Sequence, residues 1–492
     1  MIESPNLHGD RADVWHAAAE ARDPRFDGVF YTGVTSTGIY CRCVCPARMP
    51  KRANRRYFPS AAAAEKAGFR PCLVCRPEKA PGAAPIDQKA RLAAQALARI
   101  EAGALEEQGL DDLARDLGVT GRLLRRATAD VFGASPIDLA QTHRLLTAKR
   151  LLTETRLPVT EIAFASGFQS VRRFNALFLE RYGFPPSRLR LKRTEAREPT
   201  LTLDLVARGT FDPSDNFTFL ASRAMDGVEI AMPGSYTRTL KIGAHAGWIS
   251  IKPSPRGISL TLSHDLSPAL RPLVSAVRGA FDLDCDVTAI DAALGGDPAL
   301  NTINEAGVRI PGGLDPFEMV IRAVLGQQVT VGAGRKLAQK LVDAYGAPIA
   351  TGIAGLERLF PTPAQIAAAD PADIAKLGMP LSRAQTVQRV GAAVAEGRVS
   401  LARGAVASGR EGLLAIPGIG PWTVEYVALR GLGDPDAFPA GDSAIRGALG
   451  LKERVEEHAE QWRPWRAYAA VRLWRRHARL TDKTQNAKEE AR

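Results

Sequence analysis

Apolar and polar residues follow different patterns in successive parts of the 492-residue chain. Between residues 89 and 192, apolar positions recur every three or four residues, which predicts amphipathic helices. Between residues 200 and 292, four stretches alternate apolar and polar residues as half-buried strands do: LTLDLVA, YTRTLKI, GWISIKP and GISLTLS. From about residue 311 to residue 480 the helical period returns, with short loops between the helices.

The first helical stretch contains the same unit twice. Its first unit opens with apolar residues at i, i+3, i+4 and i+7, namely Leu110, Leu113, Ala114 and Leu117. Gly118 ends that helix, and a basic helix, GRLLRRATADVFG, follows. Residues 159–183 repeat the arrangement with a turn at Gly167, and a long helix near 136–154 joins the two units. The pattern therefore predicts a pair of helix–turn–helix units.

Three Pro/Gly-rich or polar segments divide the chain: 78–85, 191–200 and 293–301. A chain of 492 residues also exceeds what one hydrophobic core ordinarily organises. We therefore expect a multidomain protein, mainly α with α+β parts. The predicted domains span residues 8–79, 85–192, 200–295 and 296–482, followed by a disordered tail at 483–492.

The formal net charge of +12 is concentrated in two stretches. Residues 41–79 carry ten Lys or Arg against two Glu, and residues 89–192 carry seventeen against eleven acidic residues. These stretches supply +8 and +6, so the rest of the chain sums to −2. Such a local excess suits a polyanion, and nucleic acid is the commonest one. The chain contains no run of 18 apolar residues and no signal pattern, so we expect a soluble cytoplasmic protein without a membrane partner.

Five of the six cysteines lie close together in the sequence, in the first basic stretch. Cys41 and Cys45 are four residues apart, and Cys72 and Cys75 form a C-x-x-C pair about thirty residues later. Two such pairs of thiolates can complete a tetrahedron around one Zn²⁺. A redox pair is the alternative, and spacing alone does not exclude Cys43 as a ligand.

The segments DGVFYTGVTSTGIYCRCVCPARMPKRANRRYF and AGFRPCLVCRPEKA resemble the N-terminal zinc domain of the Ada adaptive-response regulator. The resemblance implies that Cys41, Cys45, Cys72 and Cys75 hold one Zn²⁺, and that Cys41 accepts a methyl group from a methyl phosphotriester in DNA. This family usually has proline at the position of Cys43, which leaves open which of the three neighbouring sulfurs is ligand or acceptor. Methylating a thiolate removes one negative charge, so binding to promoter DNA is expected to tighten.

Residues 89–192 resemble the AraC-type DNA-binding domain, most closely in IAFASGFQSVRRFNALFLERYGFPPSRLR. In such a domain the second helix of each unit lies in the major groove. The expected DNA-contacting residues are Arg122, Arg125, Arg126, Gln169, Ser170, Arg172, Arg173 and Asn175. Four neighbours are expected in the core instead: Phe168, Phe174, Leu177 and Phe178. For each arginine, a solvated helix face is the alternative interpretation.

The stretch LLAIPGIGPWTVEYVALRG (413–431) places the glycine-rich turn PGIG between two helices. Glycines such as Gly418 and Gly420 allow a tight turn whose N–H groups bind phosphate at a helix N-terminus. With Asp442 22 residues after Gly420, the turn resembles the signature of the helix–hairpin–helix DNA glycosylases. A carboxylate there would stabilise the sugar cation and orient water, while a plain helix N-cap is the alternative. A monovalent cation at the hairpin is a further candidate cofactor.

Two absences narrow the class of glycosylase. Trp422 occupies the position of the Schiff-base lysine of strand-nicking members, so we expect base removal without strand cleavage. The only cysteine after Cys75 is Cys285, which excludes the iron–sulfur loop of the endonuclease III branch. Residues 200–480 resemble AlkA-type 3-methyladenine DNA glycosylase II, notably in IPGGLDPFEMVIRAVLGQQV, GMPLSRAQTV and WRPWRAYAAVRLW.

That resemblance implies an α+β N-terminal glycosylase domain followed by an all-α helix–hairpin–helix core. It also implies that Trp422, Tyr426 and Trp474 line the base pocket, with Arg223 beside them. Electron-rich rings favour a base made cationic by methylation, and the base must first leave the stack. Gln328 stands where the family inserts a wedge into the gap left by the flipped base. For each aromatic residue alone, ordinary core packing is the alternative.

The main hypothesis is a fused protein that excises alkylated bases and senses methyl phosphotriesters to regulate transcription. Its expected partners are alkylated double-stranded DNA, promoter DNA and RNA polymerase, and we expect a nucleoid-associated monomer. No P-C-H-R acceptor motif occurs, so no O6-methylguanine repair is expected. The alternatives are a glycosylase with a passive zinc and helix–turn–helix tether, or a transcription factor with an inactive glycosylase half.

Overall fold

The computed structural model describes most of the chain: residues 10–22, 27, 30–77, 88–101, 103–107, 109–155, 157–189, 200–300, 307–451 and 453–490. The linker predicted at 78–85 and nearly all of the one predicted at 191–200 lie outside these residues. Within the described part, no helix is both long enough and apolar enough to cross a bilayer.

A small four-stranded sheet organises the N-terminal part, in the order β3–β1–β2–β4. Strand β1 is antiparallel to β2 and β3, whereas β4 runs parallel to β2. Gly33 is required in β1, because a Cβ there would lie 2.6 Å from the Phe58 ring. The elements are α1 (Asp10–Glu20), β1 (Tyr31–Val34), β2 (Ile39–Arg42), a 3₁₀ turn (Arg52–Asn54), β3 (Arg55–Phe58), α2 (Ala61–Lys66) and β4 (Arg70–Pro71).

The next part is entirely helical and contains the two predicted helix–turn–helix units. Gly118 and Gly167 stand at the predicted turns with φ of +69° and +84°, a left-handed conformation that glycine adopts without strain. The helices are α3 (Gln88–Glu101), α4 (Ala104–Glu107), α5 (Leu110–Asp116), α6 (Gly121–Phe132), α7 (Pro136–Glu154), α8 (Val159–Ala165), α9 (Val171–Tyr182) and a 3₁₀ turn (Pro186–Arg188).

A five-stranded antiparallel sheet follows, in the order β5–β9–β8–β7–β6. Leu201, Leu203 and Leu205 are buried while Thr202 and Asp204 are exposed, as the alternation predicted. The elements are β5 (Thr200–Val206), α10 (Ser214–Ala221), β6 (Glu229–Met232), β7 (Ser235–Ile242), β8 (His245–Ser254), β9 (Gly257–Ser263), a 3₁₀ segment (His264–Ala269), α11 (Leu270–Ala280) and α12 (Val287–Leu294). Strand β6 was not predicted, because EIAM is too short to show a period.

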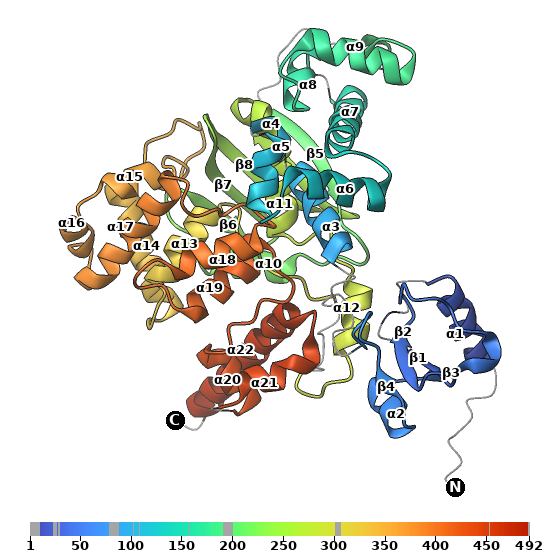
Figure 1. Ribbon diagram of the computed structural model, residues 1–492. Helices are drawn as coiled ribbons and strands as arrows, with labels where there is room; N and C mark the ends of the chain where they lie inside the picture. The colour runs from blue at the N-terminus through green and yellow to red at the C-terminus, as the bar shows by residue number, and fades with distance from the viewer. Residues whose placement is uncertain are drawn as a thin grey trace. The chain divides into compact units, whose positions relative to one another are not determined.

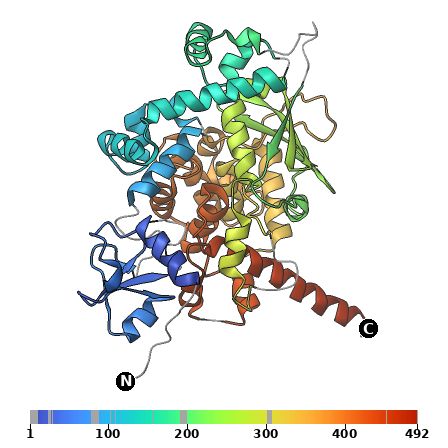
Figure 2. The same ribbon diagram turned by 90° about the vertical axis from the view of Figure 1, so that its right-hand side faces the viewer.

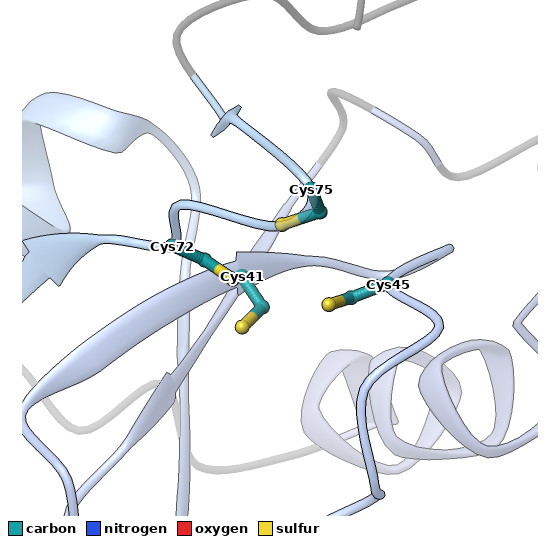
Figure 3. A group of neighbouring side chains, drawn as sticks. All are labelled: Cys41, Cys45, Cys72 and Cys75. Atoms are coloured by element: carbon teal, nitrogen blue, oxygen red, sulfur yellow. The ribbon is translucent and has the colours of Figure 1, made fainter. Parts of the chain in front are cut away.

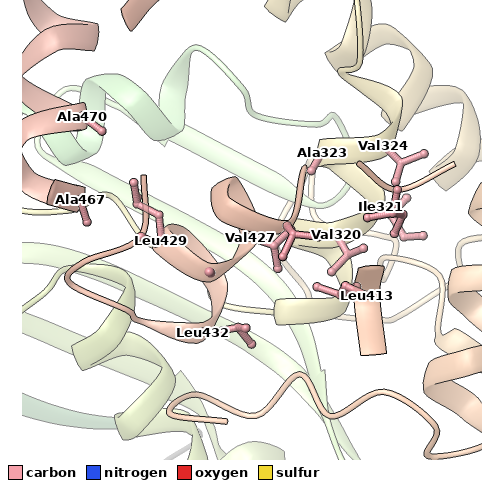
Figure 4. Packing of buried hydrophobic residues seen from close by; sticks show 14 of the residues in the cluster. Val320, Ile321, Ala323, Val324, Leu413, Val427, Leu429, Leu432, Ala467 and Ala470 are labelled. Carbon is pink, nitrogen blue, oxygen red and sulfur yellow. The ribbon is translucent and has the colours of Figure 1, made fainter. Parts of the chain in front are cut away.

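The C-terminal helices enclose one apolar core, in which Val320 and Val324 of α13 meet Val427 of α19 and Leu413 of α18 (Figure 4). Ile290 of α12 belongs to the same core, so this core crosses the boundary predicted at residue 295. The elements are α13 (Pro316–Leu325), α14 (Val331–Tyr345), α15 (Pro363–Ala368), α16 (Pro371–Ala375), α17 (Leu381–Ala395), α18 (Val406–Leu414), α19 (Pro421–Val427), a π-helical turn (Ala428–Leu432), α20 (Ser443–Leu449), α21 (Val455–Ala459), a 3₁₀ turn (Glu460–Trp462) and α22 (Arg466–Glu490). Figure 1 shows α13 to α17 gathered together and α20 to α22 forming a second group.

The expected disordered tail at 483–492 differs from the structure. Helix α22 continues to Glu490, and its last turns lie at the C-terminal end of the red ribbon in Figure 2. The segment DKTQNAKEE contains no Gly or Pro, and its Lys, Gln, Ala and Glu residues are good helix formers. Residues 491 and 492 lie outside the described part.

Candidate functional site

Four cysteines from separate segments of the N-terminal sheet converge on one point (Figure 3). Cys41 lies in β2, Cys45 in the loop that follows, and Cys72 and Cys75 in the turn after β4. Their sulfur atoms all lie within 4.8 Å of one another. Tetrahedral Zn²⁺ with Zn–S bonds of about 2.3 Å holds its sulfurs about 3.8 Å apart, so this donor set fits zinc.

The four sulfurs differ in exposure. Cys41 is partly exposed, whereas Cys45, Cys72 and Cys75 are buried. The backbone N–H of Arg42 donates to the Cys75 sulfur at 3.3 Å, which is an additional stabilisation of a thiolate there. Cys41 therefore offers the most accessible sulfur of the four.

Cys43 lies apart from this group. Its side chain is 2% exposed and packs in an apolar cluster with Trp15, Ala18 and Phe30. It is absent from the four converging sulfurs. Cys43, which spacing alone did not exclude as a zinc ligand, is therefore a core residue in the described structure.

The surface of the N-terminal domain is strongly basic. The exposed cations include Arg48, Lys51, Arg52, Arg56, Lys66 and Arg70. Arg42 differs from these residues, because its buried guanidinium pairs with Asp27 inside the domain. An exposed basic surface of this kind suits a polyanion, while Arg42 serves the fold.

All eight residues predicted to contact DNA in the helix–turn–helix units are exposed: Arg122, Arg125, Arg126, Gln169, Ser170, Arg172, Arg173 and Asn175. Of the four residues predicted to be in the core of the second helix–turn–helix unit, Phe168, Phe174 and Phe178 are buried and Leu177 is partly buried. The Ser170 hydroxyl also caps α9 by accepting the Arg173 N–H. Ser170 therefore has a local structural role whether or not it contacts DNA.

The three aromatic residues predicted to line the base pocket lie together. Trp422 and Tyr426, four residues apart on α19, stack with ring centroids 5.3 Å apart and 20° between their planes. Trp474 of α22 lies 5.9 Å from Tyr426 at 55°. A base sandwiched between two rings needs a centroid separation of about 7 Å, twice the ordinary contact distance. The rings are therefore closed on one another, and a base needs a ring to shift or an outer face to stack on.

Asp442 connects this cluster to the backbone. It is the N-cap of α20, where its Oδ1 accepts the Ala444 and Ile445 N–H groups at 2.9 and 3.1 Å. Oδ1 also accepts the Trp474 indole N–H at 3.2 Å, and Oδ2 accepts that of Trp422 at 3.0 Å. Asp442 is thus an N-cap, and the same carboxylate accepts the indole N–H groups of Trp422 and Trp474.

Two residues beside the aromatic cluster escaped the sequence analysis, Phe219 and Arg430. The guanidinium of Arg223 lies 3.6 Å from the centre of the Phe219 ring, and that of Arg430 lies 4.4 Å from it. Arg430 also donates a hydrogen bond to the Tyr426 hydroxyl. The signal was helical spacing, since Phe219 precedes Arg223 by four residues and Arg430 follows Tyr426 by four.

These two cations change the electrostatics of the pocket. Burial lowers the pKa of Arg223 to about 10, which still leaves it charged at neutral pH. Burial alone would raise the pKa of the Tyr426 phenol, but the Arg430 and Arg223 charges bring it below its ordinary value. The phenol is therefore held by cations on one side of the aromatic cluster.

The hairpin and the predicted wedge lie in loops between helices. Gly418 has φ of +97°, and a Cβ there would lie 2.0 Å from the Thr386 hydroxyl oxygen, so both conformation and space demand glycine. Gly420 is the N-cap of α19. Gln328 is exposed between α13 and α14 with φ of +55°. The structure thus presents Gln328 at the surface of the loop.

Four family models match successive parts of the chain. They are the metal binding domain of Ada over residues 14–78, a helix-turn-helix domain over 113–192, the AlkA N-terminal domain over 202–315, and the HhH-GPD superfamily base excision DNA repair protein over 321–462.

Relatives align with the whole chain and with its parts. The chain is 39% identical over 474 residues to the probable bifunctional transcriptional activator/DNA repair enzyme AlkA of Mycobacterium tuberculosis, covering 93% of this chain and 95% of the relative. It is 34% identical over 277 residues to DNA-3-methyladenine glycosylase 2 of Escherichia coli, covering 54% and 93%. A 60-residue alignment at 52% identity matches the bifunctional transcriptional activator/DNA repair enzyme Ada of E. coli, covering 12% and 17%.

Proposed function

Because the chain belongs to the family of bifunctional AlkA-type transcriptional activators and DNA repair enzymes, we propose that it excises alkylated bases of the 3-methyladenine type from double-stranded DNA. One observation carries this proposal: the Asp442 carboxylate accepts the indole N–H groups of both Trp422 and Trp474. An anion fixed beside an aromatic cluster suits a reaction in which a base stacks and a sugar becomes positive.

The reaction is hydrolysis of the bond between the base nitrogen and C1′ of the sugar. The aromatic faces bind the extruded base, and a base made cationic by methylation is favoured by their π electrons. As the bond breaks, its electron pair leaves with the base and positive charge develops on the sugar, where the Asp442 carboxylate opposes it. A base that is cationic therefore leaves neutral, and the water that adds to C1′ gives its proton to the bulk solvent. The strand stays intact, because Trp422 stands where a lyase needs its lysine.

We also propose that the N-terminal domain takes methyl groups from methyl phosphotriesters. Bound Zn²⁺ would keep the sulfurs of Cys41, Cys45, Cys72 and Cys75 as thiolates at neutral pH. The Cys41 sulfur attacks the methyl carbon, an S–C bond forms, and the C–O bond breaks. Its electron pair stays on the oxygen, so the products are a methylated cysteine and an ordinary phosphodiester. The partial exposure of Cys41 among three buried cysteines supports this choice of acceptor.

Methylation would act on the helix–turn–helix part through charge. The transfer removes one negative charge from a basic surface, so affinity for a promoter should rise and depend more steeply on salt. We propose that the four predicted domains divide the work in this way, and that a monomer, associated with the nucleoid, contacts RNA polymerase when bound at the promoter. A monovalent cation at the hairpin would assist phosphate binding. Equal affinity and equal salt slope of methylated and unmethylated protein would contradict the regulatory part.

One experiment tests the enzymatic part. Dimethyl-sulfate-treated duplex DNA is incubated with the full chain, the released bases are separated by chromatography, and the strands are run on a denaturing gel before and after alkali. We expect 3-methyladenine to be released and nicks to occur only after alkali. Release equal to that from DNA without protein would overturn the proposal, and nicks before alkali would overturn the assignment as a glycosylase without lyase activity.

A further inference from the structure

Two adjacent glutamines in the loop between α13 and α14 have different surroundings. Gln328, the predicted wedge, is exposed and adopts φ of +55°. Gln327, directly before it, is only partly exposed and is tied to three other segments by hydrogen bonds. A left-handed conformation is sterically unfavourable for a residue with a side chain, so it persists only where neighbouring contacts hold the backbone in place.

The side-chain amide of Gln327 bridges two elements of the hairpin region. Its Nε2 donates to the carbonyl oxygen of Gly418 at 3.1 Å and contacts the hydroxyl oxygen of Thr423 at 3.0 Å. Gly418 belongs to the glycine-rich hairpin, and Thr423 follows the pocket residue Trp422 on α19. One amide therefore joins the wedge loop both to the hairpin and to the helix that carries the pocket.

The backbone of the same residue is tied to a third element. The carbonyl oxygen of Gln327 accepts a hydrogen bond from Arg383 of α17 at 2.7 Å. Three residues further along α17, the Thr386 hydroxyl contacts the hairpin carbonyl of Pro417 at 3.2 Å. The wedge loop, the hairpin and α17 thus form a closed set of hydrogen bonds in which Gln327 contributes both its backbone and its side chain.

We propose that Gln327 is a positioning residue that couples the hairpin's grip on DNA to insertion of the wedge during base extrusion. This inference rests on the proposed glycosylase function. When the hairpin docks on a phosphate, the Gln327 amide fixes the distance from that contact to residue 328. The wedge then enters the duplex at a set depth, and α19 with its pocket moves as part of the same rigid unit. Without the amide the hairpin still binds DNA, but the wedge is no longer held at that depth.

The test removes the amide while keeping the length of the side chain. Gln327→Met loses both side-chain contacts, and we expect base release under single-turnover conditions to slow about tenfold on 7-methylguanine paired with cytosine. That factor corresponds to about 1.4 kcal/mol. Affinity for undamaged duplex, measured by fluorescence anisotropy, should stay within about twofold. When the same 7-methylguanine faces an abasic site it is unpaired, so extrusion is easier. Gln327→Met should then release base less than about threefold more slowly than wild type.

A double-mutant cycle separates this role from a general loss of stability. Thr423→Val removes only the hydroxyl partner, so it should slow release by itself but add little in the Gln327→Met background. Gln388→Met is the matched control, because the Gln388 amide also bridges two helices, by a 2.9 Å bond to Ala367, away from the hairpin. We expect Gln388→Met to release base at the wild-type rate, even where its thermal midpoint falls as far as that of Gln327→Met.

The outcomes are distinct. If wild type releases neither 7-methylguanine from these duplexes nor 3-methyladenine from dimethyl-sulfate-treated DNA, the proposed function itself fails; if it releases only 3-methyladenine, the same comparison of Gln327→Met with wild type is made on the treated duplex. If wild type is active and Gln327→Met matches it on the paired target, the coupling role is wrong. An equal loss on the paired and unpaired targets would also overturn it, since the residue would then act in a step other than extrusion.

Discussion

The Asp442→Asn substitution separates the two roles that Asp442 combines. As an N-cap, its Oδ1 accepts two backbone N–H groups of α20, and an asparagine oxygen caps a helix about as well. As an anion, its carboxylate would oppose the charge that develops on the sugar. Asparagine therefore preserves the cap, worth about 1 kcal/mol, and removes only the charge.

The size of the expected loss follows from the distance and the surroundings. A carboxylate about 4 Å from a sugar cation, in a partly buried site, contributes about 4 kcal/mol at an effective dielectric constant of about 20. Each 1.36 kcal/mol is tenfold in rate, so the variant should release base about a thousandfold more slowly. The indole N–H of Trp422 would also face an amide N–H in place of the Oδ2 that accepts it in wild type, which adds to the loss.

The assay is single-turnover release of 3-methyladenine from alkylated duplex DNA, with anisotropy for DNA binding and thermal unfolding for the fold. Asp370→Asn is the matched control, because Asp370 caps α16 by accepting the Ala372 N–H at 2.8 Å, in the same helical region. We expect both variants to unfold near the wild-type midpoint and only Asp442→Asn to lose activity. Release by Asp442→Asn within tenfold of wild type would refute the charge argument and leave Asp442 as a cap alone.

Four further predictions concern the zinc site, the aromatic cluster and Asp315, the N-cap of α13. After exposure to DNA that carries methyl phosphotriesters, peptide mass mapping should find one added methyl on Cys41, retained in Cys43→Ala and lost in Cys41→Ala; a methyl on Cys43 would move the chemistry to that sulfur. Removing zinc with a chelator should unfold the N-terminal domain, seen as loss of amide protection over residues 30–77, while base release continues. Trp422→Phe keeps an aromatic face, although a smaller one, and loses the indole N–H to the carboxylate, so release should slow about tenfold, whereas an unchanged rate would mean that this hydrogen bond does not matter. Burial raises the pKa of Asp315 from 3.8 to about 6, so the protonated carboxyl stabilises the fold below about pH 4 and this stabilisation is lost as pH rises through about 6. Asparagine does not titrate, so the urea midpoint of Asp315→Asn should fall less than that of wild type across this range. Parallel curves for the two proteins would contradict this prediction.

Local patterns predicted those parts of the fold that depend on neighbouring residues. The helix–turn–helix helices and four strands follow from apolar periods, and the turn glycines Gly118 and Gly167 follow from the breaks between them. Strand β6 has only four residues and gives no period, so its pairing with β7 is a property of the sheet. The tail was judged by its polarity, whereas helix formation there depends on propensity along the chain.

The cysteine cluster shows where spacing stops being informative. In a continuous strand Cys41 and Cys43 would face the same side, and both could reach the metal. Strand β2 ends at Arg42, so the turn that follows frees Cys43 from that alternation. Cys43 then packs against Trp15 of α1, a residue 28 positions earlier in the chain. Tertiary packing, which the sequence does not show, thus keeps the Cys43 sulfur out of the group of four.

The arrangement of the aromatic cluster also depends on tertiary packing that the sequence does not show. Trp422 and Trp474 could be recognised as aromatic residues, but their N–H groups reach one carboxylate only because α19, α20 and α22 meet there. Those hydrogen bonds orient both indole rings and the carboxylate in the closed cluster, where the outer ring faces are the ones open to stacking. If the proposed function holds, a base that stacks on this cluster would meet a preorganised anion, and folding would supply the free energy of orienting that anion instead of substrate binding.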